Sequence, residues 1–430
     1  MNNSERLVSL DIGTSKIKVV IGEVQKDSLN IIGVGTAKSN GMKKGAIVDI
    51  DETVQSIKAA VEEAERMVNM SIDRVIVGIN GNHIDLQSCQ GIVAVASDDR
   101  EIGDEDVKRV IDAAQVISIP PEREIIDVIP KQFIVDGLDE ITDPRGMIGV
   151  RLEMEGTIIT CARTMLHNIL KCVEGAGLEV IDISLQPLAS GAIALSSDEK
   201  ELGVALIDVG GGSTTVSVFE NSHLVATSVI PLGGDNITKD IAIGLKISTE
   251  EAEKVKVEHG HSYYPEAMEE ETFDVSVIGS DQVYTFNQLE LADIIEARME
   301  EIYTYAAREI KKMGYGELPG GFVLTGGCMR TPGALELAQE MYYANVRVAI
   351  PDYIGVREPQ FTSGVGILKF AHKNAKIQGK VLGDSVTESA PKTEKMVKKS
   401  DKLKPKKEKK AAPKQKKESS VANLFKYFFD

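Results

Sequence analysis

Three short strands led by an Asp-Gly turn occur twice in this chain, and this repeat limits its fold more than any other feature of the sequence. The first copy reads RLVSLDIG, KIKVVIGEV and NIIGVGTA, and the second reads LGVALIDVG, STTVSVFEN and HLVATSVIP, about 200 residues later. Helical stretches over residues 51–68, 163–176 and 289–312 alternate with such strands. We therefore predict an α/β fold with two related halves that arose by a diverged internal duplication.

Each copy of the repeat ends its first strand in an aspartate and a glycine turn. Glycine lets the backbone N–H groups of such a turn approach a ligand closely, and the neighbouring hydroxyls can meet oxygen atoms. Either turn alone is equally compatible with an ordinary glycine hairpin whose Thr and Ser are solvated. Two turns that face one another across a cleft, however, can hold the phosphates of one nucleotide. The turns are Asp11-Ile12-Gly13-Thr14-Ser15-Lys16 and Asp208-Val209-Gly210-Gly211-Gly212-Ser213-Thr214-Thr215.

Charged side chains in the two turns indicate how a nucleotide would be held. The carboxylates of Asp11 and Asp208 can hold Mg²⁺ through its waters, since Mg²⁺ takes few carboxylates and keeps much of its hydration shell. Lys16 would neutralise a terminal phosphate. The chain has no G-x-x-x-x-G-K-[ST] sequence, which excludes a P-loop as the phosphate cradle. We therefore expect a nucleotide and Mg²⁺ at these turns.

Two further segments fit the other end of such a site. In TGGCMRTPG, from Thr325 to Gly333, backbone without side chains can lie flat against a base or ribose, although a plain strand-to-helix turn is the alternative. Glu251 and Lys254 lie three residues apart on one predicted helix face and can reach ribose hydroxyls, although a solvated surface pair is the alternative. Each segment is weak evidence for a nucleotide site by itself, and the evidence comes from all four segments in this order along the chain.

The ordered set resembles the actin, heat-shock-chaperone and sugar-kinase superfamily, in which two ribonuclease-H-like halves clamp ATP and Mg²⁺ between two phosphate hairpins and a TGG-type adenosine loop. The resemblance covers residues 5–375. Within it, ISLQPLASGAIAL resembles the connecting helix whose first turn orients the attacking water. That position is Gln186, an amide that can orient water but is no strong base; the alternative is a polar residue that only starts a helix. The nucleotide-binding residues implied by the resemblance are Asp11, Gly13, Thr14, Ser15, Lys16, Asp208, Gly210, Gly211, Gly212, Ser213, Thr214, Gly234, Glu251, Lys254, Gly326, Gly327 and Cys328.

Three other stretches resemble the FtsA family, the bacterial cell-division relatives of actin. They are VIVGINGNHI, DVIPKQFIVDG and DPRGMIGVRLE, and Pro144-Arg145-Gly146-Met147 is their most distinctive part. In that family actin's subdomain 1B is missing and a subdomain called 1C is inserted elsewhere. One departure is that Cys328 and Met329 replace the small or polar residues usual in the adenosine loop, while its glycines remain. The implied division is 1A over 1–83 and 161–198, 1C over 84–160 with a helix at 104–116, 2A over 199–233 and 316–357, 2B over 234–315, and a closing helix of 1A over 358–375.

Charge is unevenly distributed along the chain. The total of −17 divides into −27 for residues 1–371 and +10 for residues 372–418, with no net charge beyond them. The acidic body argues against nucleic acid as a partner, whereas the basic segment would be attracted to an anionic surface. No window approaches the roughly 18 uninterrupted apolar residues of a spanning helix, and four cysteines without metal-ligand spacing fit a reducing compartment. We therefore expect a cytoplasmic protein without a membrane-spanning helix.

The carboxyl-terminal part of the chain predicts a tether. Residues 376–418, rich in Lys, Pro, Glu, Ser and Ala, are expected to form a flexible basic linker, and residues 419–430 an amphipathic helix. A helix on such a linker is poorly placed to join a core, so an interfacial membrane helix is favoured over a protein-docking helix. Its apolar stripe consists of Val421, Leu424, Phe425, Phe428 and Phe429.

Together these features predict an ATP-binding, actin-like adaptor that is at most a slow Mg²⁺-dependent ATPase. The resemblance implies that it forms filaments, tethers the tubulin-like protein FtsZ to the cytoplasmic face of the membrane at the division site, and binds later division proteins through subdomain 1C. It places the FtsZ carboxyl-terminal peptide on residues 234–315. There Arg298, a lone arginine amid carboxylates, is our choice of contact, and an ion pair with Glu301 is its alternative.

Two other functions stay open at this point. A small-molecule kinase of the same superfamily would need a catalytic acid or base and a substrate pocket at the cleft. A pilus-assembly relative of the FtsA family would bind the peptide of a transmembrane partner and would need no membrane helix of its own. The tail distinguishes the two from the adaptor.

Overall fold

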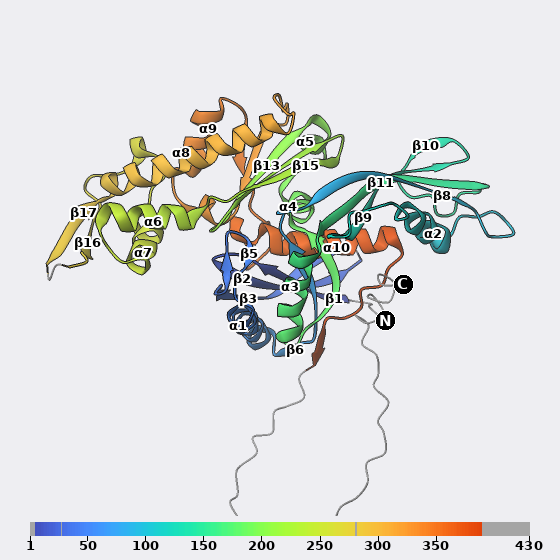
Figure 1. Cartoon of the computed structure of the whole chain (residues 1–430), viewed down its shortest axis with the longest axis horizontal. Helices are drawn as coiled ribbons and strands as arrows, with labels where there is room; N and C mark the ends of the chain where they lie inside the picture. The colour runs from blue at the N-terminus through green and yellow to red at the C-terminus, as the bar shows by residue number, and fades with distance from the viewer. Residues whose placement is uncertain (1–4, 27, 280–281, 389–430) are drawn as a thin grey trace, which may run out of the picture.

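The first half of the chain forms a five-stranded sheet covered by helices on both faces. We describe a computed structural model that covers residues 5–26, 28–279 and 282–388 (Figure 1). The sheet has the order β12-β7-β1-β2-β3, in which β1, β2 and β3 are antiparallel and β7 and β12 run parallel to β1. The strands are β1 (Glu5–Ile12), β2 (Lys16–Gln25), β3 (Ser28–Lys38), β7 (Arg74–Ile79) and β12 (Glu179–Leu185).

Four helices pack on this sheet through apolar stripes. On one face, Ile57 of α1 (Ile50–Val68) and Val173 of α3 (Arg163–Gly175) join a cluster with Leu10 and Val19. The other face is covered by α4 (Gln186–Ala194) and α10 (Thr362–Gln378). The sequence sets the ends of α1, because Asp49 accepts a hydrogen bond from the N–H of Glu52 and Asn69 ends the helix in the left-handed region.

The second half repeats the same topology. Its sheet has the order β15-β14-β13-β18-β19, again with an antiparallel three-stranded unit followed by two parallel strands. The predicted duplication of an α/β unit is thereby confirmed at the level of strand order. The strands are β13 (Val204–Val209), β14 (Thr214–Glu220), β15 (His223–Ile230), β18 (Phe322–Thr325) and β19 (Val346–Val348), and α5 (Ser197–Leu202) precedes them.

An outer lobe extends from the second half at the left of Figure 1. Its helices are α6 (Gly234–Leu245), α7 (Thr249–His259) and the long α8 (Gln288–Lys312), and α8 begins at a capping box between Asn287 and Glu290. A hairpin of β16 (Thr272–Ser276) and β17 (Val283–Asn287) lies at the tip. Helix α9 (Ala334–Tyr342) packs beside α8, where Tyr303 is fully buried and donates a hydrogen bond to the carbonyl of Ala334 at 2.8 Å.

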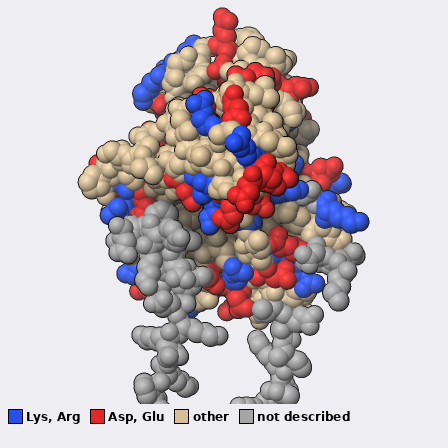
Figure 2. Space-filling model, turned by 90° about the vertical axis from the view of Figure 1, so that its right-hand side faces the viewer, with Lys and Arg blue, Asp and Glu red and all other residues tan. Residues whose placement is uncertain are grey.

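A separate layer is inserted after β7 and lies at the right of Figure 1. It is a four-stranded sheet of order β10-β9-β11-β8, and one face is covered by α2 (Asp104–Ala114), two residues shorter than the predicted helix. The strands are β8 (Asp85–Ala94), β9 (Arg123–Val135), β10 (Leu138–Ile141) and β11 (Arg151–Ala162). Figure 2 looks at this end of the molecule, where acidic and basic side chains are interspersed without a large field of one sign.

Residues 376–388, predicted as the start of the basic linker, are folded instead. Helix α10 continues to Gln378, and β20 (Val386–Glu388) pairs antiparallel with β6 (Met70–Ile72). This segment belongs to the body because Leu382 and Val386 are buried and the carboxylate of Asp384 accepts a hydrogen bond from the N–H of Arg6 at 2.8 Å. The predicted membrane helix at 419–430 and the linker from residue 389 onward lie outside the described residues.

Short elements complete the described chain. A hairpin of β4 (Met42–Lys43) and β5 (Ala46–Ile47) lies before α1, and three 3₁₀ turns occupy Tyr264–Glu266, Gly327–Arg330 and Pro359–Phe361. Within the ranges that the structure describes, no helix has the length and apolar character needed to cross a membrane.

Candidate functional site

The two aspartate-glycine turns line the same cavity. It has a volume of about 270 Å³ and lies between the first and second sheets, with the turn after β1 on one side and the turn after β13 on the other. Every residue of the predicted turns lines it except Val209 and Thr214. Thr214 is buried instead, and its hydroxyl donates to the carbonyl of Leu232 at 2.9 Å. The next residue, Thr215, faces the cavity in its place because side chains alternate along a strand.

The turns approach each other so closely that the second one requires glycine. A Cβ added to Gly211 would lie 1.7 Å from Oγ of Ser15, and one added to Gly212 would lie 2.5 Å from a methyl carbon of Thr14. The Ser15 hydroxyl also donates to Asp235 at 3.0 Å, which joins the two halves of the chain across the cavity. The two turns therefore face each other across the cavity, as predicted.

The strand-end carboxylates lie at the floor of the cavity with a lysine and an amide. Asp11 is 3% exposed and accepts hydrogen bonds from Nζ of Lys18 at 2.8 Å and from Nε2 of Gln186 at 2.6 Å. Burial raises the pKa of Asp208 to about 6; Lys18 opposes the rise, and the nearby charge of Asp11 adds to it. The pair thus presents negative charge that a cation would stabilise.

Nothing in this site forms a cage for a metal ion. Among the described residues, no group of three or more His, Cys, Asp or Glu side chains could hold one. Two carboxylates beside open space do fit Mg²⁺, because Mg²⁺ uses one or two protein carboxylates together with water and phosphate oxygens. Asp11 and Asp208 would hold such an ion, mainly through its waters.

A second lysine, Lys18, lies beside the carboxylates in addition to the predicted Lys16. Lys16 lines the cavity, but its side chain is exposed, whereas Lys18 is largely buried against Asp11. Lys16 and Lys18 share one face of β2 because they are two residues apart on a strand. This spacing could have predicted that Lys18 lies on the same face as Lys16, but the sequence does not show which of the two lysines is more buried.

The adenosine end of the predicted site also opens on the cavity. Gly326, Gly327 and Cys328 line it, as does Gly234 at the start of α6. Gly326 has φ +98°, and a Cβ there would lie 2.4 Å from Oδ1 of Asp208, so a side chain is excluded. The Cys328 thiol is buried and donates to the carbonyl of Gly210 at 3.3 Å, which ties this loop to the second turn.

The predicted pair of Glu251 and Lys254 does not reach the cavity. The two side chains form an ion pair at 3.6 Å, and that of Lys254 is 59% exposed, which matches the surface-pair alternative. Glu253 and Lys256 line the cavity instead, and Nζ of Lys256 donates to the Thr238 hydroxyl at 2.7 Å. A helix turns about 100° per residue, so a shift of two residues moves a pair to the opposite face.

Other lining residues were missed, although Asn80 and Arg330 lie inside the stretches VIVGINGNHI and TGGCMRTPG that the sequence analysis singled out. They come from loops and helix starts that approach the turns only in the folded chain. Asn80 is one example: it donates to the carbonyl of Gly45, whose N–H donates to the hydroxyl of Thr14 at 3.1 Å. The missed residues include Gly45, Asn80, Asp235, Arg330, Gln360 and Ser363.

Arg298 lies on α8 in the outer lobe, away from the cavity. It pairs with Glu301, as the alternative reading held, and also with Asp240 of α6, at 2.5 Å from Nε and 3.0 Å from a second nitrogen. Asp240 is 58 residues away in the sequence, so helix spacing could not predict it. These partners raise the pKa of Arg298, with the Asp240 hydrogen bonds as the main cause, so its charge is permanent.

Comparisons with known proteins agree on one family. The family model "Cell division protein FtsA" matches residues 205–366, and the model "SHS2 domain inserted in FTSA" matches residues 81–160. The cell division protein FtsA of Bacillus subtilis (strain 168) is 62% identical over 390 residues, which cover 91% of this chain and 89% of the relative.

Solved structures with similar folds are much more distant in sequence. A "PilM-PilN type IV pilus biogenesis complex" aligns with a TM-score of 0.58 at 16% identity and covers 86% of this chain and 98% of that one. MreB5 of Spiroplasma citri bound to ADP aligns with a TM-score of 0.54 at 12% identity and covers 87% and 98%. These likenesses show the actin-like fold.

Proposed function

The chain belongs to the FtsA family of cell division proteins, and from this premise we propose that it binds ATP with Mg²⁺, forms actin-like filaments on the membrane, and tethers FtsZ filaments there during division. The observation that carries the nucleotide part is that two matching turns, far apart in the sequence, line one cavity together with the glycine loop at Gly326. The MreB5 structure of similar fold contains ADP, which supports this assignment.

ATP would lie with its phosphates between the two turns. Backbone N–H groups of the glycine-rich turn and the hydroxyls of Thr14 and Ser213 are the donors available to phosphate oxygens, and the Ser15 hydroxyl would join them by turning away from Asp235. Asp11 and Asp208 would hold Mg²⁺, which supplies charge neutralisation of the phosphates. Lys256 and the loop at Gly327 also line the cavity and are our candidates for contacts with the ribose and base.

Any hydrolysis is expected to be slow. Gln186 is the polar residue at the start of α4 beside Asp11, and its amide can position a water molecule but cannot accept the proton as a strong base. The small-molecule kinase alternative is less favoured for the same reason. The pilus-assembly alternative has only a shared fold to support it, at 16% identity.

Membrane attachment rests on the carboxyl-terminal sequence. Full burial of a Leu or Phe side chain is worth roughly 1.5 to 3 kcal/mol, so four such residues half-buried in a bilayer contribute about 3 to 6 kcal/mol before ordering costs. A single tail is therefore a weak anchor. A filament that presents many tails would bind by avidity, while the lysines of the linker would add attraction to anionic lipids.

We place the FtsZ carboxyl-terminal peptide on the outer lobe, residues 234–315, with Arg298 as a contact. Its guanidinium is partly exposed while it pairs with Asp240 and Glu301, so a carboxylate of the peptide could join the same cluster. Later division proteins would bind the inserted layer at residues 84–160.

Cosedimentation with anionic vesicles tests the two halves of the proposal together. Full-length protein should pellet with vesicles, more completely with ATP and Mg²⁺ than without. Removal of residues 419–430, or the single change Phe425→Glu, should abolish pelleting in either condition. If a chain truncated after Lys417 pelleted as completely as the full chain at the same nucleotide and salt, the membrane anchor would have to be abandoned.

A further inference from the structure

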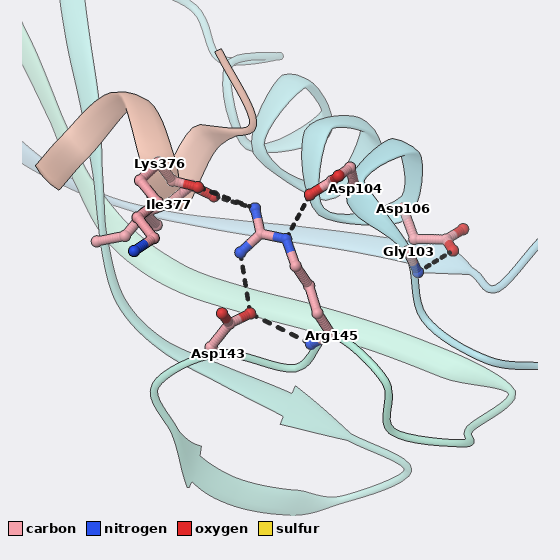
Figure 3. Close-up of polar contacts among 7 residues, drawn as sticks. All are labelled: Gly103, Asp104, Asp106, Asp143, Arg145, Lys376 and Ile377. Carbon is pink, nitrogen blue, oxygen red and sulfur yellow. Dashed lines mark hydrogen bonds and ion pairs between the residues drawn. The ribbon is translucent and has the colours of Figure 1, made fainter. Parts of the chain in front are cut away.

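Arg145 links the inserted layer to the end of α10. Figure 3 shows the Arg145 guanidinium between three segments. Its Nε donates to Asp104 at 2.5 Å and its Nη1 to Asp143 at 3.0 Å, both within the layer. Its Nη2 donates to the carbonyls of Lys376 at 3.2 Å and Ile377 at 2.8 Å, at the end of α10. A cation that donates to the last carbonyls of a helix also interacts favourably with the helix dipole.

A second contact joins the same two elements. Asp127 of β9 accepts hydrogen bonds from Asn374 at 2.8 Å and from Gln378 at 2.9 Å, and Gln378 also donates to the carbonyl of Val128 at 3.0 Å. Asn374 and Gln378 lie one turn apart on α10 and are both buried. Ile377 adds an apolar contact with the core of the layer. We call these contacts, together with those of Arg145, the α10 dock.

The other end of α10 lies at the nucleotide cavity. Ser363, in its first turn, lines the cavity and is 6% exposed, and its hydroxyl has no hydrogen-bond partner among the described residues. Gln360, just before the helix, also lines it. A helix of 17 residues spans about 25 Å, so α10 runs directly from the cavity to the dock.

Helix α10 is packed tightly enough to act as a rigid element between its ends. A Cβ added to Gly366 would lie 2.1 Å from the carbonyl oxygen of Ala189 in α4, and the side chains of Val365 and Leu368 are fully buried. By contrast, the hydrogen bonds from Arg145 to the carbonyls of Lys376 and Ile377 lie at the rim of the layer, where the Arg145 side chain is 24% exposed. These contacts, and not the packed length of α10, are therefore the part of this path that can open.

We propose that the α10 dock couples the orientation of the inserted layer to nucleotide binding: the docked layer and an occupied cavity favour each other through α10. The inference rests on the proposed nucleotide site. The ligand would contact Ser363 and Gln360 and hold the start of α10, and the helix would then present its last carbonyls and Gln378 in the position that Arg145 and Asp127 require. Thermodynamic linkage makes this coupling reciprocal, so loss of the dock must weaken nucleotide binding.

The full-length protein tests the coupling with Mg²⁺–ATP as the probe. We expect Arg145→Ala to weaken ATP binding in calorimetric titration by at least about fivefold, the lower range of typical allosteric couplings. Gln378→Ala removes the second contact from the α10 side and should act in the same direction. Arg109→Ala is the matched control: Arg109 binds Asp106 and, at 2.8 Å, the carbonyl of Ala94, all within the layer. It should leave ATP affinity unchanged.

Hydrogen exchange distinguishes loss of the coupling from a general loss of stability. In the wild-type protein and in Arg109→Ala, Mg²⁺–ATP should slow amide exchange in α2 and in residues 143–147, and in Arg145→Ala this effect of ATP should disappear. If Arg145→Ala and Gln378→Ala both bound ATP as tightly as the wild type or more tightly, and ATP still slowed exchange in the layer, the coupling would be wrong. The proposed nucleotide site would be unaffected by that result. If the wild-type protein bound no ATP, the proposed nucleotide site would fail, and the coupling with it.

Discussion

Nε2 of Gln186 donates a hydrogen bond to Oδ1 of Asp11 at 2.6 Å, and this contact joins the first residue of α4 to the end of the first strand. The bond uses the N–H of the amide and directs the side chain toward the cavity floor. The amide oxygen is then the atom that can accept a hydrogen bond from a water molecule. Gln186 is therefore connected to the proposed Mg²⁺ site as well as to the position of an attacking water.

Gln186→Ala should lower ATP turnover by about tenfold or more while changing ATP affinity little, since positioned polar groups contribute to the chemical step. Single-turnover hydrolysis and equilibrium titration measure the two effects separately. A loss of affinity equal to the loss of turnover would mean that Gln186 only supports Asp11.

Gly211→Val should reduce Mg²⁺–ATP affinity by more than tenfold, or about 1.4 kcal/mol, because its side chain would collide with Ser15 and separate the two turns. Gly316→Val is the control, since a Cβ there meets nothing within 4 Å. Asp208→Ala should cause a loss at least as large. ATP titrations in which Gly211→Val and Asp208→Ala both match the wild type would rule out the two-turn clamp.

Mg²⁺-dependent nucleotide binding should weaken as the pH falls through about 6. Burial raises the pKa of Asp208 to about 6, so its carboxylate is ionised above that pH and protonated below it, and only the ionised form attracts Mg²⁺. Between about pH 7.5 and about pH 5.5 the ionised fraction drops about fourfold. Phosphate groups titrate in the same range, so Asp208→Asn, which retains only their contribution, is the reference. An identical pH dependence in both proteins would exclude Asp208 from the Mg²⁺ site.

Lys256→Ala and Lys254→Ala should differ, although they remove the same charge from the same helix. Lys256 lines the cavity with its side chain 13% exposed, whereas Lys254 is 59% exposed in a surface ion pair. We expect Lys256→Ala to weaken ATP binding severalfold and Lys254→Ala to leave it unchanged. The opposite order, measured by fluorescence titration, would restore the original assignment from the sequence.

Arg298→Glu should weaken binding of an FtsZ carboxyl-terminal peptide in fluorescence anisotropy, because it places a third carboxylate beside Asp240 and Glu301. Arg308→Glu is a matched control: it makes the same charge change on α8, at an exposed arginine whose guanidinium lies over the ring of Tyr305. Full peptide affinity in Arg298→Glu would remove this contact from the proposal.

Local patterns in the sequence were sufficient for the repeated α/β unit and the two glycine turns. Strand alternation, helical periodicity and glycine turns depend on neighbouring residues, so they can be read without the fold. The family resemblance added the inserted layer, and the structure places it as a separate sheet after β7.

Tertiary structure decided which side chains line the cavity and which residues pair. Lys18 lies deeper than Lys16, Glu253 and Lys256 take the place expected for Glu251 and Lys254, and Asp240 reaches Arg298 from another helix. The face that a helix turns to a cavity depends on how its apolar stripe packs, and partners far apart in sequence meet only after the chain has folded. For the same reason the amino-acid pattern alone gave no sign that α10 would connect the cavity to Arg145.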